Sequence, residues 1–318
     1  MTTPDPTDPR TRHYGDFYGV GTGTAGGFDS ADSDTADPDG DVAIVIGNCQ
    51  AESVRIMLDG GGLRTVRLPA VHELVSADLP HLEGWLGRAS ILVSQPVRDD
   101  YHDLPIGTRQ LTARMSPSAR TVMFPVVRFA GLYPAHAIIR PPADASLVPP
   151  LVEYHDLRLL AEAAGNADAH RPLDATTIRA VADLSRSELR RREVEFDAIV
   201  ASDLFDEPTF DLMRTLNHPG NPIWTTTAAR IRERLGLPDH VVDPGRPLLD
   251  SIHAPREAAV VDAWGLDDDP TDDWRVDGAT LPGSVVREAH LAWYAEHPEV
   301  VTAGLARHRE TLSLLGLA

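Results

Sequence analysis

The first half of the chain alternates short apolar runs with stretches of helical periodicity. Residues 42–46 form an unbroken apolar run rich in β-branched side chains, which is typical of a strand buried on both faces of a parallel sheet. Gly47 ends this run, and apolar residues then recur at helical spacing until the glycines at 60–62. This order predicts a strand, a turn at residues 48–50 and a helix.

The same alternation continues along the chain and then gives way to helical periodicity. Further strands are expected at residues 65–68, 90–93 and 121–127, with a helix at residues 79–86. From residue 151 onward helical spacing dominates, at residues 184–196, 210–216 and 228–235. The pattern therefore predicts an α/β protein, with a parallel sheet in its N-terminal half and a mainly helical C-terminal half.

Two segments lack such periodicity. Residues 1–40 are rich in Asp, Gly, Thr and Pro, and Val20 is their only branched aliphatic residue, so a disordered arm is expected there. The spacing of Gly21, Gly23 and Gly26 matches the dinucleotide fingerprint G-x-G-x-x-G, but no strand precedes it and no helix follows, which favours a flexible linker.

The C-terminal part is expected to lie on the core. Residues 239–283 are rich in Pro and Asp and are interpreted as a long surface excursion. A final helical pair is expected at residues 284–294 and 299–315. The expected organisation is thus an arm (1–40), a catalytic core (41–237) and an excursion with C-terminal helices packed on that core (238–318).

Charge and composition narrow the possible partners. The 318 residues include 48 acidic side chains and 29 basic ones, all of them arginine, and the net charge is −19. Such a chain would repel an extended phosphate backbone, so nucleic acid is not an expected partner, whereas arginines can still hold a small phosphorylated ligand. No apolar run approaches the roughly 20 residues of a membrane span, and the first residues do not resemble a signal peptide. We therefore expect a cytoplasmic protein.

Cys49, the single cysteine, lies in the predicted turn between the first strand and its helix. One thiol cannot form an internal disulfide or a Cys-type metal cluster, and no zincin-type histidine pair occurs, so no metal is expected. Ligands of open α/β sheets bind at the carboxyl ends of the strands, and the positive end of a helix favours the nucleophilic thiolate. Asn48 and Gln50 add amide donors beside it. The alternative is that Cys49 is a small buried residue beneath the helix.

A nucleophile of this kind needs a base, and several histidines are candidates. His218 precedes Pro219 between two helical stretches, and His136 follows the fourth expected strand on the same expected sheet edge. His155 and His72 are weaker candidates, and for each histidine a structural role is the alternative. Gln95, after the strand at 90–93, could donate to an oxyanion or could cap a turn.

Five short fragments in order carry a family resemblance. They are Gly47-Asn48-Cys49-Gln50, Ser94-Gln95-Pro96, Phe124-Pro125 with Gly131-Leu132-Tyr133-Pro134, Tyr154-His155-Asp156 and Asn217-His218-Pro219. In order and spacing the chain resembles the WcbI-type polysaccharide biosynthesis family from about residue 41 to residue 237. The resemblance implies an SGNH-like fold with a cysteine where SGNH-type hydrolases carry serine. It also implies a coenzyme A-dependent acyltransferase that acetylates a sugar hydroxyl during capsule or related glycan assembly.

The resemblance also assigns roles and partners. It implies that Cys49 is the nucleophile or acyl-handling thiol and that His218 is the base. It also implies that Asn48, Gln50, Gln95 and Tyr133 are hydrogen-bond donors at the site or contact substrate, beside the candidate His136. Acetyl-CoA and a sugar-containing acceptor are the expected partners. No motif selects among Arg246, Arg256 and Arg275 as phosphate ligands. Two alternatives stay open, a cysteine-dependent SGNH-like esterase or thioesterase and a non-catalytic protein that binds coenzyme A or a glycan.

Overall fold

The computed structural model describes residues 5–20, 40–141, 144 and 146–318, which fall into two compact units. The first unit comprises residues 1–126, 190–201 and 221–248, and the second comprises residues 127–189, 202–220 and 249–318. This division differs from the expected boundary between residues 237 and 238. The reason is that residues 221–235 form a helix that packs on the first unit, whereas residues 127–189 build a separate core.

The first unit is built on a four-stranded parallel sheet in the order β2-β1-β3-β4. Its elements are β1 (Asp41–Ile46), α3 (Cys49–Leu58), β2 (Leu63–Val66), a 3-10 turn (Ser76–Asp78), α4 (Leu79–Leu86), β3 (Ile91–Ser94), α5 (Thr108–Thr112), β4 (Arg120–Met123) and α8 (Asn221–Leu235). The expected α/β class and parallel sheet are confirmed. The chain leaves β1 toward β2 on one side and returns to β3 on the other, so the carboxyl ends of β1 and β3 form a topological switch point.

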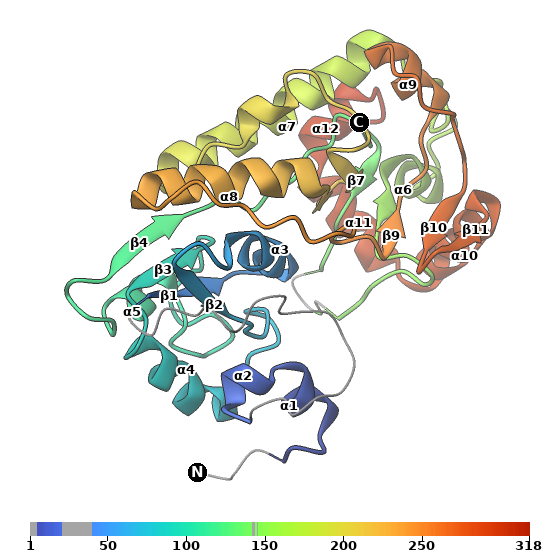
Figure 1. Ribbon diagram of the computed structural model, residues 1–318. Coiled ribbons are helices and arrows are strands. Elements are labelled where there is room, and N and C mark those ends of the chain that lie inside the picture. Colours follow the sequence, from blue (N-terminus) through green and yellow to red (C-terminus); the bar gives the residue numbers. More distant parts are fainter. Residues whose placement is uncertain (1–4, 21–39, 142–143, 145) are drawn as a thin grey trace. The chain divides into compact units, whose positions relative to one another are not determined.

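Helices cover both faces of this sheet (Figure 1). Helices α3 and α8 contact each other on one face, and α4 lies on the opposite face. Alternate β1 side chains serve the two faces, so Ile44 and Ile46 join the α4-side cluster with Leu82, Trp85 and Leu92, all 5% exposed or less.

Residues 5–20 are ordered against the first unit, in contrast to the expected arm. They contain α1 (Pro9–His13) and α2 (Gly15–Tyr18). Phe17 is 1% exposed within the α4-side cluster, and its carbonyl accepts a hydrogen bond from Trp85 Nε1 at 3.1 Å. The buried Phe17 ring thus supplies the apolar contact that this segment, which has few aliphatic residues, would otherwise lack. The expected linker glycines at 21, 23 and 26 lie outside the described residues.

The second unit combines small antiparallel sheets with helices. Its elements are β5 (His136–Ala137), β6 (His155–Asp156), α6 (Leu157–Ala163), most of α7 (Ala175–Glu195), a 3-10 turn (Ser202–Phe205), β7 (Met213–Thr215), β8 (His218–Pro219), β9 (Ile252–His253), α9 (Ala258–Trp264), β10 (Trp274–Val276), β11 (Ala279–Leu281), α10 (Gly283–Glu296), α11 (Pro298–Arg307) and α12 (Arg309–Leu314). Helices α6, α10 and α11 pack around a core that includes Leu157, Leu160, Tyr294 and Val300.

Two expectations for this unit are wrong in detail. Residues 210–216 are not helical, because β7 pairs there with β8 and its neighbour β9 comes from far along the chain. Residues 239–283 are not a plain surface loop, because they contain α9 and the sheet β11-β10-β9. Within the described chain, no helix is long and apolar enough to cross a membrane.

Candidate active site

The turn after β1 places Cys49 at the start of helix α3. Asn48 is the N-cap, and its Oδ1 accepts a hydrogen bond from the backbone N–H of Gln50 at 2.9 Å. Cys49 is therefore the first helical residue, and it is exposed. It lies at the switch point of the sheet, where the positive end of a ten-residue helix stabilises a thiolate.

Gln95 clamps this turn from the neighbouring strand end. Its Oε1 accepts from the backbone N–H of Asn48 at 2.8 Å, and its Nε2 donates to Gln50 Oε1 at 3.1 Å. Gln95 is 2% exposed and Gln50 is fully buried. A Cβ at position 47 would lie 2.4 Å from Gln95 Oε1, so the close approach requires Gly47. The structure thus brings four predicted residues together, and Gln95 already uses both ends of its carboxamide within the turn.

A cavity of about 170 Å³ lies beside Cys49 in the first unit. Its lining comprises Tyr14, Val45, Gly47, Asn48, Cys49, Ala51, Glu52, Arg67, Leu68, Pro69, Ala70 and Glu73. Glu52 pairs with Arg55 at 2.7 Å and with Arg67 at 3.1 Å, which occupies its carboxylate. Cys49 therefore borders a small cavity whose lining includes the apolar side chains of Val45, Ala51, Leu68, Pro69 and Ala70.

His218 lies in the second unit, on β8. Its backbone N–H donates to Thr215 Oγ1 at 3.2 Å, and its ring meets the edge of the Tyr154 ring at 6.3 Å between centroids. Tyr154 donates its hydroxyl proton to Asn217 Oδ1 at 2.7 Å, which fixes this turn. Burial, with the nearby charges of Arg214 and His253, lowers the pKa of His218 to about 4. The imidazole is therefore neutral at pH 7, the form that can accept a proton.

His136 and Tyr133 also lie in the second unit. His136 belongs to β5, which pairs with β6, and its expected place on the carboxyl edge of the parallel sheet stays a prediction. Its ring stacks between Tyr133 and Trp274 at centroid distances of 5.8 and 5.2 Å. Tyr133 is 3% exposed and donates its hydroxyl proton to the Met213 carbonyl at 2.8 Å. Both rings thus pack within this unit, and their contact with substrate stays a prediction.

The structure also gathers charged residues near His218 that the sequence did not reveal. Asp250 Oδ1 accepts from Arg214 Nε at 2.9 Å and lies 2.8 Å from His253 Nε2, and Asp250 Oδ2 accepts from Arg275 at 2.6 Å. Burial is the main cause of the lowered pKa of His218, and two members of this group, Arg214 and His253, lower it further. They come from β7, β9, β10 and the segment before β9, and no local spacing could have indicated that they meet.

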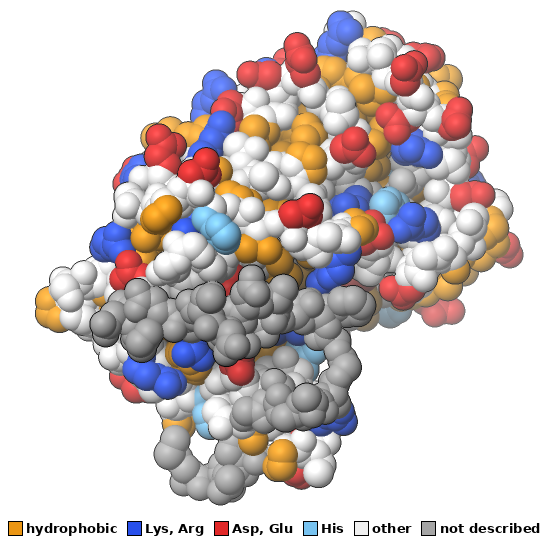
Figure 2. Space-filling view, in the orientation of Figure 1, with side chains coloured by type: hydrophobic (Ala, Val, Ile, Leu, Met, Phe, Trp, Pro, Cys, Tyr) orange, Lys and Arg blue, Asp and Glu red, His pale blue; other side chains and the backbone are white. Residues whose placement is uncertain are grey.

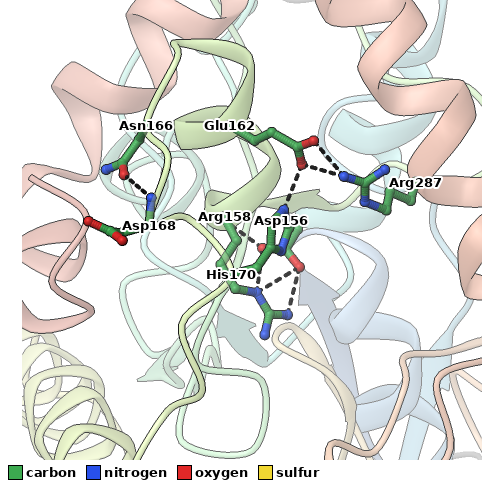
Figure 3. Close-up of polar contacts among 7 residues, drawn as sticks. All are labelled: Asp156, Arg158, Glu162, Asn166, Asp168, His170 and Arg287. Atoms are coloured by element: carbon green, nitrogen blue, oxygen red, sulfur yellow. Dashed lines mark hydrogen bonds and ion pairs between the residues drawn. The ribbon is translucent and has the colours of Figure 1, made fainter.

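A second charged network surrounds the start of α6 (Figure 3). Asp156 caps α6 and pairs with Arg158 at 2.7 Å, and Arg158 also pairs with Glu257 at 2.9 Å. Burial alone would raise the pKa of Asp156, but Arg158 holds that pKa below its usual range. Glu162 pairs with Arg287 and His170 (Figure 3). These carboxylates serve ion pairs that hold the helix in place.

The remaining candidates have structural partners or are exposed. His155 is fully buried and its Nδ1 lies 2.8 Å from the Tyr294 hydroxyl, whereas His72 is exposed. Arg256 pairs with Asp268 at 2.9 Å, and Arg246 is exposed. On the face drawn in Figure 2, arginines are interspersed with Asp and Glu. Among the described residues, no group of three or more His, Cys, Asp or Glu side chains is placed to hold a metal ion.

Comparison with known proteins places this architecture in a family. A family model described as "Polysaccharide biosynthesis enzyme WcbI" matches residues 42–240, which is more than half of the chain. A solved structure described as WcbI, a novel polysaccharide biosynthesis enzyme, as native protein without a disulfide bond between coenzyme A and a cysteine, is similar with a TM-score of 0.72. It is 19% identical and covers 87% of this chain and 99% of that one, so the likeness shows a shared fold. Comparison with curated proteins finds no match. By the extent of the family match, the chain belongs to the WcbI family of polysaccharide biosynthesis enzymes.

Proposed function

We propose that this protein is a coenzyme A-dependent O-acyltransferase that moves an acetyl group from acetyl-CoA to a sugar hydroxyl of a polysaccharide precursor. The observation that carries the proposal is the position of Cys49, the first residue of α3 at the switch point of the parallel sheet. Support comes from the family, one of whose solved structures is described with coenzyme A and a cysteine.

In the first of two routes, Cys49 carries the acyl group. Its thiolate attacks the thioester carbonyl, a new C–S bond forms, and the bond to the coenzyme A sulfur breaks as that thiolate leaves. The sugar hydroxyl then attacks the Cys49 thioester, its proton passes to a base, and the Cys49 thiolate is released. The position of Cys49 at the helix N-terminus supports this route by favouring the thiolate in both steps.

In the second route, the sugar hydroxyl attacks the thioester carbonyl of acetyl-CoA directly while a base takes its proton. The C–S bond breaks, the coenzyme A thiolate leaves, and Cys49 orients the donor. In both routes we assign the base role to His218, which lies in the family fragment Asn217-His218-Pro219. Its lowered pKa leaves the imidazole unprotonated at neutral pH and makes it a weaker base than an ordinary histidine. Gln95 is assigned a positioning role, since its carboxamide holds Asn48 and Gln50.

The test follows coenzyme A release from acetyl-CoA by liquid chromatography, with and without a panel of sugar and nucleotide-sugar acceptors. We expect release that depends on acceptor, with an acetyl ester on the sugar seen by mass spectrometry. Cys49→Ala and His218→Ala should lose turnover while circular dichroism shows a retained fold. Intact-mass detection of an acetylated Cys49 after acetyl-CoA alone would select the first route.

Other outcomes would decide against the proposal. Release of free acetate at the same rate without acceptor would indicate a hydrolase. Full turnover by both variants would refute the assigned roles. Absence of calorimetric binding of coenzyme A and acetyl-CoA at about millimolar ligand, which corresponds to a binding free energy weaker than roughly −4 kcal/mol, would refute the coenzyme A dependence.

A further inference from the structure

The N-terminal segment, residues 5–20, contributes a wall to the cavity beside Cys49. Tyr14, between α1 and α2, lines that cavity together with Cys49, Leu68 and Ala70. This segment precedes the part of the chain that the family model matches, which begins at residue 42. The wall is therefore a feature of this chain beyond the family core.

Several contacts fix this segment to the first unit. Arg10 donates to Asp78 Oδ2 at 2.8 Å and to Oδ1 at 3.0 Å, and Tyr18 donates its hydroxyl proton to Asp78 Oδ1 at 2.8 Å. Asp78 is 1% exposed, and Phe17 is 1% exposed in the α4-side cluster. A buried carboxylate and a buried ring thus anchor the residues on both sides of Tyr14.

The polar groups around the cavity are engaged with one another. Tyr14 donates its hydroxyl proton to Glu73 Oε2 at 2.8 Å, and the Arg67 guanidinium lies 5.8 Å from the centroid of the Tyr14 ring. Glu52 is held by Arg67 and Arg55. What the cavity offers a ligand is therefore chiefly the Tyr14 ring and the apolar side chains of Val45, Ala51, Leu68, Pro69 and Ala70.

We infer that this cavity receives the acyl group of the donor thioester and that Tyr14 is a specificity-determining residue, because its ring closes one side of the acyl site. The inference rests on the proposed function, since it names where the acyl group lies when Cys49 meets its thioester. Paired carboxylates and an apolar floor suit a short hydrocarbon chain better than a phosphate or a sugar.

The volume of the cavity limits the length of the acyl group that it can hold. The cavity measures about 170 Å³. An apolar cavity of about 150 Å³ is enough to hold benzene, so the space fits an acyl group of roughly two to six carbons. Pockets for whole drug-sized ligands run to about 300–1,000 Å³, so the nucleotide of coenzyme A would lie outside it.

The experiment uses Cys49 as a reporter, because it is the only cysteine of the chain. The full-length protein is treated with methyl and with hexyl methanethiosulfonate, and modification is followed by intact mass. The Cys49 thiolate attacks the sulfenyl sulfur, an S–S bond forms, and methanesulfinate leaves with the electron pair of the broken bond. Each hexyl-to-methyl rate ratio is divided by that of glutathione under the same conditions.

For the wild type we expect a normalised ratio of about ten, the gain from burying about two methylenes before reaction. Tyr14→Ala should lower the ratio at least about threefold, because the chain loses one wall. Tyr14→Phe keeps the ring and should keep the ratio. The matched control is Arg12→Ala, an exposed residue of α1 that does not line the cavity. Circular dichroism checks each fold, and Tyr14→Ser replaces Tyr14→Ala if the latter unfolds.

A wild-type ratio equal to that of glutathione, an unchanged ratio in Tyr14→Ala, or an equal loss in Arg12→Ala would each overturn the inference. The reagents contain neither coenzyme A nor an acceptor, so the result does not depend on turnover. If the acyltransferase assay fails but the normalised ratio is raised and falls in Tyr14→Ala, the proposed function is refuted, and the cavity is still shown to hold a short hydrocarbon chain beside Cys49. Acceptor-dependent turnover without a raised hexyl-to-methyl ratio in the wild type would refute the acyl cavity and the role of Tyr14, and would leave the proposed function standing.

Discussion

Removal of the Gln95 clamp should loosen the turn that holds Cys49 without opening a cavity. In Gln95→Met the side chain keeps nearly the same volume but loses its carboxamide. The backbone N–H of Asn48 then loses the Gln95 acceptor, and the buried Gln50 Oε1 loses the hydrogen bond from Gln95 Nε2. Each deprived polar group costs about 1–3 kcal/mol, and because Asn48 is half-buried we expect about 2–4 kcal/mol in total.

This loss should appear locally, at the start of α3, and in the thiol. Hydrogen exchange followed by mass spectrometry on peptides from residues 47–58 should report an opening free energy lower by about 2–4 kcal/mol. As the first turn frays, Cys49 loses part of the helix-end stabilisation of its thiolate, about 0.3–1 kcal/mol. Its alkylation by iodoacetamide at a pH below the thiol pKa should slow about two- to fivefold.

Thr108→Val provides the matched control for this prediction. The Thr108 hydroxyl donates to the Gln95 carbonyl at 3.0 Å and accepts from the backbone N–H of Val97 at 3.1 Å, but it does not touch the turn. We expect a comparable loss of stability around β3 with an unchanged Cys49 alkylation rate. If Gln95→Met leaves both the exchange of α3 and the alkylation rate at wild-type values, the clamp argument is refuted.

Two further predictions concern the second unit. The pKa of His218 is lowered from 6.5 to about 4, so between these pH values the unfolded chain binds a proton that the folded chain does not. The free energy of unfolding should therefore rise with pH from about 4 to 6.5, and thermal unfolding of His218→Asn should lack this contribution. A His218 ring that titrates near 6.5 by NMR would contradict the prediction. Asp156→Asn leaves Arg158 with one carboxylate fewer in a half-buried network, so thermal unfolding should show a free energy of unfolding lower by about 1–3 kcal/mol. The control Glu195→Gln, at the exposed pair with Arg191, should lower it by less than about 0.5 kcal/mol. Equal losses in the two variants would contradict the stabilising role of the network.

The turn that carries Cys49 was predictable from the sequence because its determinants are local. The apolar run of β1, the stop at Gly47 and the N-cap preference of Asn48 lie within ten residues of one another. The bond between Gln95 and Asn48 was not predictable, because it depends on β3 lying beside β1, and strand order is set by packing across the whole sheet.

Non-local partners also explain the wrong expectations. Few aliphatic residues occur before residue 40, yet residues 5–20 are ordered because Phe17 contacts Trp85 and Tyr18 contacts Asp78, which lie sixty or more residues away along the chain. Residues 210–216 show helical spacing, but β7 gains its partners from β8 and β9. In each case a tertiary contact outweighs the local pattern.

Two polar residues of the family fragments already have hydrogen-bond partners within the chain. Gln95 spends both ends of its carboxamide on Asn48 and Gln50, and the Tyr133 hydroxyl bonds to the Met213 carbonyl. Buried amides and hydroxyls engaged in this way are costly to redirect toward a substrate, because each would leave its present partner unsatisfied. We therefore expect such residues to form the rigid frame of the proposed site, with the chemistry assigned to side chains that the frame holds at its edge, as the turn holds the exposed Cys49.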